Sequence, residues 1–132
     1  MITHIVNVIH SVVREHVSKV LSSKRSSKWP RVRKQFLKIN NCCAACKSTT
    51  LLQVHHIVPF HYNSALELDP TNFITLCMSK NECHYKLGHG GSFKAYNPYV
   101  KEDCTFVLDN PSKLIVIQAK AELYRKVNAP GN

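Results

Sequence analysis

The chain has few acidic residues and no long apolar run. Its 132 residues hold eight Asp or Glu against 18 Lys or Arg, so the formal net charge is +10. Such a field favours a polyanion or an acidic membrane surface as partner. No uncharged apolar stretch reaches the length of about 18 residues that a membrane span needs. A small-residue cleavage site after an apolar segment is also missing, which excludes a typical export signal. We therefore expect a cytoplasmic protein without membrane contact.

The length of the chain fits one compact domain with an appended helical arm. Apolar residues recur with a period near 3.6 over residues 2–21, which predicts an amphipathic helix. Its apolar face must pack either on the rest of the domain or on a second copy, so a homodimer through this helix is one of two alternatives. We place the arm and a polar joint at 1–27, the core at 28–97 and a C-terminal helical segment at 98–132.

Turn and cap signals predict the remaining elements. In chain order they are a helix from Pro30 to about Ile39, a short β-hairpin within 42–60, a helix from Asn81 or Glu82 to Gly88, and two helices opened by Asn97-Pro98 and Asn110-Pro111. Residues 113–118 are alternatively a strand. The sequence therefore predicts the α+β class.

Two cysteine pairs stand about 30 residues apart, a spacing typical of a structural zinc site. They are Cys43-x2-Cys46 and Cys77-x5-Cys83. Without an export signal we expect a reducing compartment, in which paired cysteines indicate metal binding rather than disulfides. Cys42 and Cys104 are left over, and we interpret them as reduced, packed thiols. The alternative for Cys42 is competition with Cys43 for the metal.

A histidine doublet, His55-His56, lies between the cysteine pairs, and His84 follows the last cysteine. Adjacent side chains on a strand point to opposite faces. One ring of the doublet can therefore face an ion while the other faces a neighbouring substrate. Taken singly, each histidine is as easily a polar core or surface residue, but the cysteine frame favours the metal interpretation.

The positive charge is concentrated in one segment that contains no acid. Its members are Lys24, Arg25, Lys28, Arg31, Arg33, Lys34 and Lys38. Cations this close repel one another unless a polyanion is near, so we expect contacts with DNA phosphates. The alternative is a solvated helix face.

Several ordered motifs together resemble the HNH endonucleases, the ββα-metal nucleases, in the subgroup with a zinc-stabilised core found in phages and prophages. The motifs are Cys-x2-Cys, Val54-His55-His56-Ile57-Val58-Pro59, Asp69-Pro70-Thr71-Asn72-Phe73-Ile74-Thr75-Leu76-Cys77 and Cys83-His84-Tyr85-Lys86. The resemblance covers about residues 28–97. It implies a zinc-held ββα-metal core flanked by N-terminal and C-terminal helices.

The resemblance also implies roles for individual residues. His56 would be the general base that activates water, His55 and His84 would be ligands of a catalytic divalent metal, and Asn72 would hold the loop and the base in place. His89 is a third ligand or, alternatively, a phosphate contact or surface residue. Asp is usual at the position of His55, and a neutral imidazole there shifts preference from Mg toward Mn, Ni, Co or Zn.

The predicted function is therefore a metal-dependent DNA endonuclease or nickase, acting in a bacterial or phage-infected cell. One alternative is a zinc-stabilised DNA-binding module without catalysis. Another is a cysteine-zinc scaffold whose charge serves an acidic partner.

Overall fold

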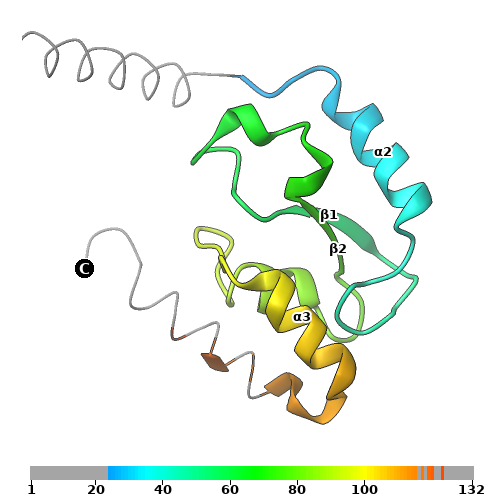
Figure 1. The fold of residues 1–132 in the computed structure, drawn as a ribbon, viewed down its shortest axis with the longest axis vertical. Helices are drawn as coiled ribbons and strands as arrows, with labels where there is room; N and C mark the ends of the chain where they lie inside the picture. The colour runs from blue at the N-terminus through cyan, green and yellow to red at the C-terminus, as the bar shows by residue number, and fades with distance from the viewer. Residues whose placement is uncertain (1–23, 116, 118, 121–122, 124–132) are drawn as a thin grey trace, which may run out of the picture.

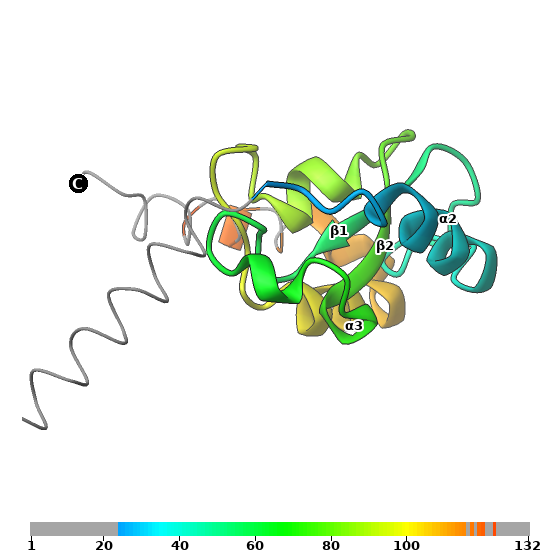
Figure 2. The ribbon, with the colours of Figure 1, turned by 90° about the horizontal axis from the view of Figure 1, so that it is seen from above.

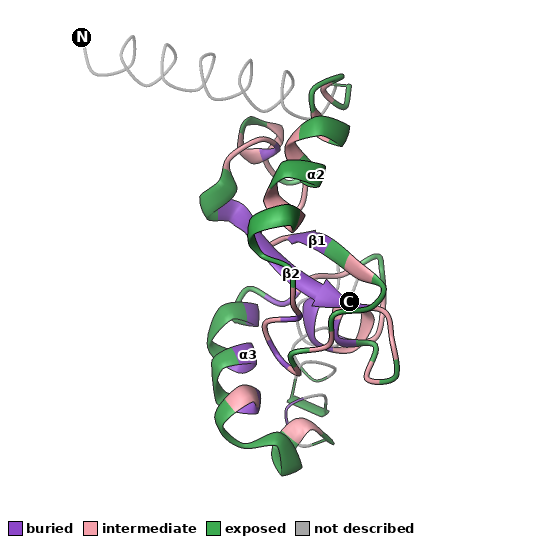
Figure 3. Ribbon diagram, turned by 90° about the vertical axis from the view of Figure 1, so that its right-hand side faces the viewer, coloured by how far each residue is buried: buried purple, intermediate pink, exposed green. Residues whose placement is uncertain are grey.

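Two antiparallel strands with helices on both sides form a small α+β fold (Figure 1). The computed structural model describes residues 24–115, 117, 119, 120 and 123. The helix predicted over 2–21, and the dimer through it, lie outside the described residues. Helices α2 (Trp29–Ile39) and α3 (Val100–Asp109) lie on opposite sides of the sheet (Figure 3).

The sheet pairs β1 (Leu52–His56) with β2 (Phe73–Cys77). The β-hairpin predicted within 42–60 is wrong, because β1 finds its partner after a loop of about 16 residues, and the segment before β1 forms a turn. All five residues of β2 are buried, as expected for its apolar and β-branched composition. The register sets His55 opposite Ile74 and His56 opposite Phe73.

Helix α2 begins and ends close to its predicted bounds. Pro30 lies in its first turn, and the side chain of Asn40 donates to the carbonyl of Phe36 at its end. No residue of α2 is buried. The helix lies beside the sheet (Figure 2) and contacts it through aromatic rings. The rings of Trp29 and Phe36 each lie 5.3 Å from the ring of Phe73.

The helix predicted from Asn81 or Glu82 to Gly88 is shorter than expected. Cys83 precedes a single π-helical turn, η3 (His84–Gly88). Three 3₁₀ turns complete the described elements. They are η1 (Ser64–Leu66), η2 (Pro70–Asn72) and η4 (Pro111–Lys113).

The cap predicted at Asn97 is displaced. Helix α3 starts at Val100 rather than Pro98, because the Asn97 side chain accepts from the backbone of Tyr99 in a turn and donates to Leu87 and Asp103. Pro111 does open the next helical segment, as predicted. The described residues of the 113–118 run are helical, so the strand alternative is wrong there.

The core lies between the sheet, η3 and α3, and cysteines form much of it. Its members are Cys43, Ala45, Ile74, Leu76, Cys77, Cys83, Leu87, Val100, Cys104, Val107 and Ile117. A core this small gives a short chain limited stability, so a metal cross-link would add to it substantially. None of the described helices combines the length and apolar character of a membrane span.

Candidate metal centres

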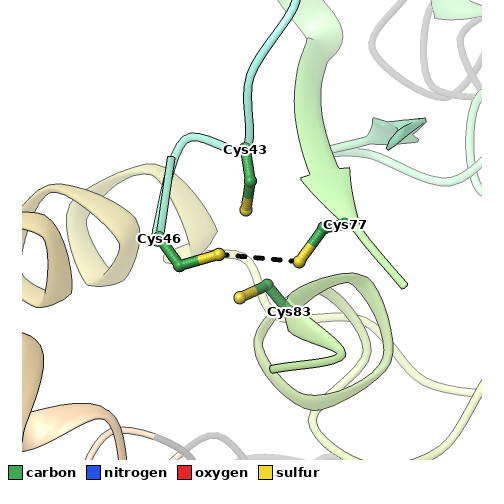
Figure 4. Close-up of side chains that lie close together, drawn as sticks. All are labelled: Cys43, Cys46, Cys77 and Cys83. Atoms are coloured by element: carbon green, nitrogen blue, oxygen red, sulfur yellow. Dashed lines mark hydrogen bonds between the residues drawn. The ribbon is translucent and has the colours of Figure 1, made fainter. Parts of the chain in front are cut away.

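Four cysteines from three segments converge on one point of the core (Figure 4). Cys43 and Cys46 come from the turn before β1, Cys77 ends β2, and Cys83 precedes η3. Their sulfur atoms all lie within 4.8 Å of one another, and Cys46 Sγ is 3.6 Å from Cys77 Sγ. In tetrahedral zinc sites with bonds of about 2.3 Å, neighbouring sulfurs lie about 3.8 Å apart. The cluster therefore could hold a zinc ion.

The cysteines of the cluster shift one another's pKa values. A hydrogen bond with Cys83 lowers the pKa of Cys43 to about 4, and the same contact raises the pKa of Cys83. Burial raises the pKa of Cys46. Buried thiolates repel one another, and a bound divalent ion would stabilise all of them in the deprotonated form.

The two remaining cysteines lie outside this cluster, as expected. Cys104 is buried on α3, and its pKa is raised by burial, whereas Cys42 is half-buried. Neither belongs to a group of residues that could hold a metal ion within the described part of the chain.

Three histidines form a second cluster beside the sheet. The ligand atoms of His55, His84 and His89 lie within 4.8 Å of one another. The ring centroids are 5.1 Å apart for His55 and His84, 4.8 Å for His55 and His89, and 5.0 Å for His84 and His89. We call these three residues the histidine triad.

The π-helical turn explains how His89 reaches the triad. A regular α-helix would place residue 89 on a different face from residue 84. Here the backbone N–H of His89 donates to the carbonyl of His84, 3.1 Å away, a spacing of five residues. This widened turn sets the two imidazoles side by side. This position is compatible with the sequence-based interpretation of His89 as a third ligand.

Hydrogen bonds orient the rings of His84 and His89. The Nδ1 atom of His84 donates to the side-chain oxygen of Gln53, and Nδ1 of His89 donates to the carbonyl of Ala95, 2.7 Å away. Each bond leaves Nε2 with a free lone pair, which is how metal-binding histidines are usually supported. Gln53 was missed from the sequence, although it precedes His55 by two residues on the same strand face.

The buried nitrogen of His55 provides the strongest test of metal fit. His55 is 2% exposed, and its Nε2 is buried without a hydrogen-bond partner. Leaving such an atom unpaired costs about 1–3 kcal/mol, which a bound ion would remove. Burial, and then the neighbouring imidazoles, hold the pKa of His55 well below its ordinary value. Burial also lowers the pKa of His84 to about 4 and lowers that of His89. The triad is therefore neutral at pH 7 and could hold a metal ion.

His56 points to the opposite side of β1 from the triad, as the alternation predicts. Its ring centroid lies 4.4 Å from that of Trp29 and 5.2 Å from that of Phe73. Nε2 donates to the backbone carbonyl of Glu67, 2.9 Å away, so Nδ1 carries the lone pair. Burial lowers the pKa of His56, which keeps the ring neutral at pH 7. The Glu67 contact was missed because a main-chain partner leaves no sequence signal.

Asn72 connects the start of β2 to the loop that follows β1. Its side-chain oxygen accepts from the backbone N–H of Val58, and its nitrogen donates to the carbonyls of Val58 and Leu66. Asn72 itself is buried. These bonds fix the loop that carries Glu67.

One pocket of about 440 Å³ includes the triad and His56. Besides these histidines, Arg25, Arg33 and the rings of Trp29, Phe60 and Phe93 line it. Among the described residues, no Asp or Glu lines this pocket. We call it the histidine pocket. The pocket thus contains the three neutral imidazoles that could bind a metal, the separate imidazole of His56, and arginine side chains with positive charge.

All seven cations predicted to contact DNA are exposed. Arg25 is ion-paired with Glu67 at 3.4 Å, and its guanidinium lies over the ring of Phe60. Arg33 lines the histidine pocket. Lys24, Lys28 and Arg31 line neither this pocket nor the adjoining hollow between α2 and β1.

Comparison of the chain with protein families, curated sequences and solved structures gives no match.

A substitution at Gly88 should affect only one of the two candidate metal sites, the histidine triad. A Cβ atom on Gly88 would lie 3.0 Å from Nδ1 of His55 and 3.1 Å from a methyl carbon of Leu76. Gly88→Ala should therefore displace the His55 ring and weaken metal binding by the triad about 10- to 100-fold, the range seen when support for ligands is lost. Cobalt titration followed by absorption spectroscopy measures this, with the thiolate bands of the cysteine cluster as internal control. Unchanged affinity at the nitrogen site would contradict the assignment of His55.

Proposed function

We propose that the chain is a metal-dependent HNH-type endonuclease that hydrolyses DNA phosphodiester bonds. The observation that carries this proposal is the division of the His55-His56 doublet. One ring belongs to the triad, and the other, on the opposite side of the strand, also lines the histidine pocket and keeps a lone pair on Nδ1. Two antiparallel strands followed by a histidine-bearing turn are also the order of elements that the resemblance implies. The turn here is one π-helical turn, shorter than the helix of the name ββα.

His56 acts as the general base. Its Nδ1 accepts a proton from water while the water oxygen attacks phosphorus, and the bond from phosphorus to the departing oxygen breaks. The carbonyl of Glu67 fixes the tautomer and stabilises the imidazolium that forms. By resemblance, the departing oxygen takes a proton from water to become a 3′-hydroxyl, and the phosphate stays on the 5′ end. His56 then releases its proton to solvent.

The triad would hold the divalent ion. When bound, such an ion supplies positive charge that stabilises the phosphate and the departing oxygen. Since the triad offers only imidazole nitrogen, Mn, Ni, Co or Zn suits it better than Mg, which prefers oxygen ligands. Arg33 adds positive charge at the pocket, whereas the charge of Arg25 is paired with Glu67. Asn72 holds the loop on which the Glu67 carbonyl lies.

A plasmid assay with a panel of metals tests the proposal. Supercoiled DNA should be nicked or linearised with Mn, Ni, Co or Zn at higher rates than with Mg. Binding without cleavage under every metal would instead support a zinc-stabilised DNA-binding module. Absence of both binding and cleavage would support a scaffold for an acidic protein partner.

The pH dependence of cleavage provides a separate check. Only neutral His56 accepts a proton, so the rate should rise with pH and then level off. Because burial lowers the pKa of His56, the midpoint should lie below about 6.5, the ordinary histidine value. Single-turnover rates between pH 4.5 and 8, at saturating metal, measure it. A midpoint above that of free histidine would be inconsistent with the buried base.

A further inference from the structure

A second hollow adjoins the histidine pocket. It has a volume of about 690 Å³ and lies between α2 and β1. Arg33 and Gln53 line both hollows, so the two meet at these residues. Gln53 is also the hydrogen-bond partner of His84. The second hollow, which we call the α2 groove, therefore leads directly away from the histidine triad.

The α2 residues of the groove belong to one helix face. Pro30, Arg33, Lys34, Leu37 and Lys38 follow the i, i+3, i+4, i+7, i+8 spacing. Pro30 and Leu37, with Leu52 from β1, provide apolar surface, and the three cations provide charge. An apolar surface bordered by cations suits the sugar and phosphate groups of a nucleic-acid strand.

The three cations of the groove are exposed, and no ion pair within the described residues neutralises them. Arg25 differs, because Glu67 pairs with it. Helix α2 contains no acid, and no acidic residue among those described lines the groove. Unneutralised charge of one sign, gathered on one face, favours a polyanion over an uncharged partner.

We propose that the α2 groove binds the phosphates of the DNA strand that flank the bond cleaved in the histidine pocket. This inference rests on the proposed function. From Pro30 to Lys38 the helix extends about 12 Å, and a DNA strand carries one phosphate per about 3.4 Å of helix axis. The face thus spans about three phosphates. Arg33 lies at the junction with the pocket, and Lys34 and Lys38 contact phosphates farther from the cleaved bond.

Two triple variants with equal charge change test the groove. One is Arg33→Gln with Lys34→Gln and Lys38→Gln. The matched control is Lys24→Gln with Lys28→Gln and Arg31→Gln. The sequence predicted DNA contacts for these exposed residues too, but they lie outside both hollows, so the proposal assigns them a smaller share of binding. Fluorescence anisotropy of a labelled 20-base-pair duplex measures binding, in a zinc-loaded His56→Ala background that prevents cleavage. Thermal melting verifies that both variants remain folded.

The groove variant should bind DNA at least about tenfold more weakly. The slope of log affinity against log salt, which is negative, should become smaller in magnitude by about two to three. The control should lose less than about threefold. A Lys34→Gln, Lys38→Gln double variant, which leaves the histidine pocket intact, should show an intermediate loss. Equal losses in the two triple variants, or no loss in either, would overturn the proposal.

A poly-glutamate competitor addresses the alternative occupant, an acidic protein. It should displace DNA from the parent protein only weakly at physiological salt. Displacement as effective as that by unlabelled DNA would contradict a nucleic-acid groove. Because binding is measured without cleavage, a protein that fails to cut plasmid can still show the difference between the groove variant and its control. The two proposals therefore fail separately.

Discussion

Replacing His56 by alanine is expected to slow DNA cleavage by about two to four orders of magnitude, the usual contribution of a general base. In the proposed mechanism the Nδ1 lone pair of His56 accepts the proton, while its Nε2 is held by the Glu67 carbonyl. The triad lies on the other side of the strand and is made of separate residues, so metal binding should be retained. Single-turnover cleavage of a labelled duplex, at saturating enzyme and metal, measures the loss.

Two further measurements separate a catalytic role from a structural one. His56→Gln keeps a side-chain N–H that can donate to Glu67 but has no basic nitrogen, so it should fold like the parent and remain inactive. Free imidazole should restore part of the activity of His56→Ala, because it fits the space left by the ring. Full turnover by His56→Gln would show that another group accepts the proton.

Replacing Cys46 by serine is expected to abolish stable folding at physiological temperature. Structural zinc supplies about 10–16 kcal/mol in small zinc-binding peptides, and a whole domain is stable by only about 5–15 kcal/mol. Three of the four clustered cysteines are buried in the core, and the cluster joins the turn before β1 to β2 and η3. Loss of the ion would therefore separate the elements that carry the triad.

Cys42→Ser is the matched control for this experiment. Cys42 precedes Cys43 directly but lies outside the cluster, so zinc content and melting temperature should remain those of the parent. Zinc per chain by elemental analysis and thermal melting by circular dichroism report both variants. A Cys46→Ser protein that melts at the parent temperature without zinc would refute the structural site.

The sequence predicted those features that depend on residue type and local spacing. Within each cysteine pair the two residues are close enough in sequence to bind one ion, and the structure brings both pairs to one cluster. Alternation along a strand predicted that His55 and His56 face different ways. Helix α2 followed from its apolar period and from Pro30.

The features that were missed depend on long-range pairing or on the main chain. The partner of β1 could not be identified because strand pairing across the loop after His56 leaves no local pattern. His89 was expected as a third ligand, but the π-helical turn that brings its ring beside His84 has no sequence pattern beyond Gly88. Glu67 contributes a backbone carbonyl, so its side-chain type carried no information about His56.

We propose that the chain holds two different ions, one among the four sulfurs and one among the three imidazoles. Anomalous X-ray diffraction from crystals of the zinc-loaded protein soaked in cobalt or nickel tests it most directly. We predict zinc at Cys43, Cys46, Cys77 and Cys83, and the soaked metal bonded to His55, His84 and His89. A single sulfur-bound ion, with the three rings unbound at saturating metal, would contradict the account.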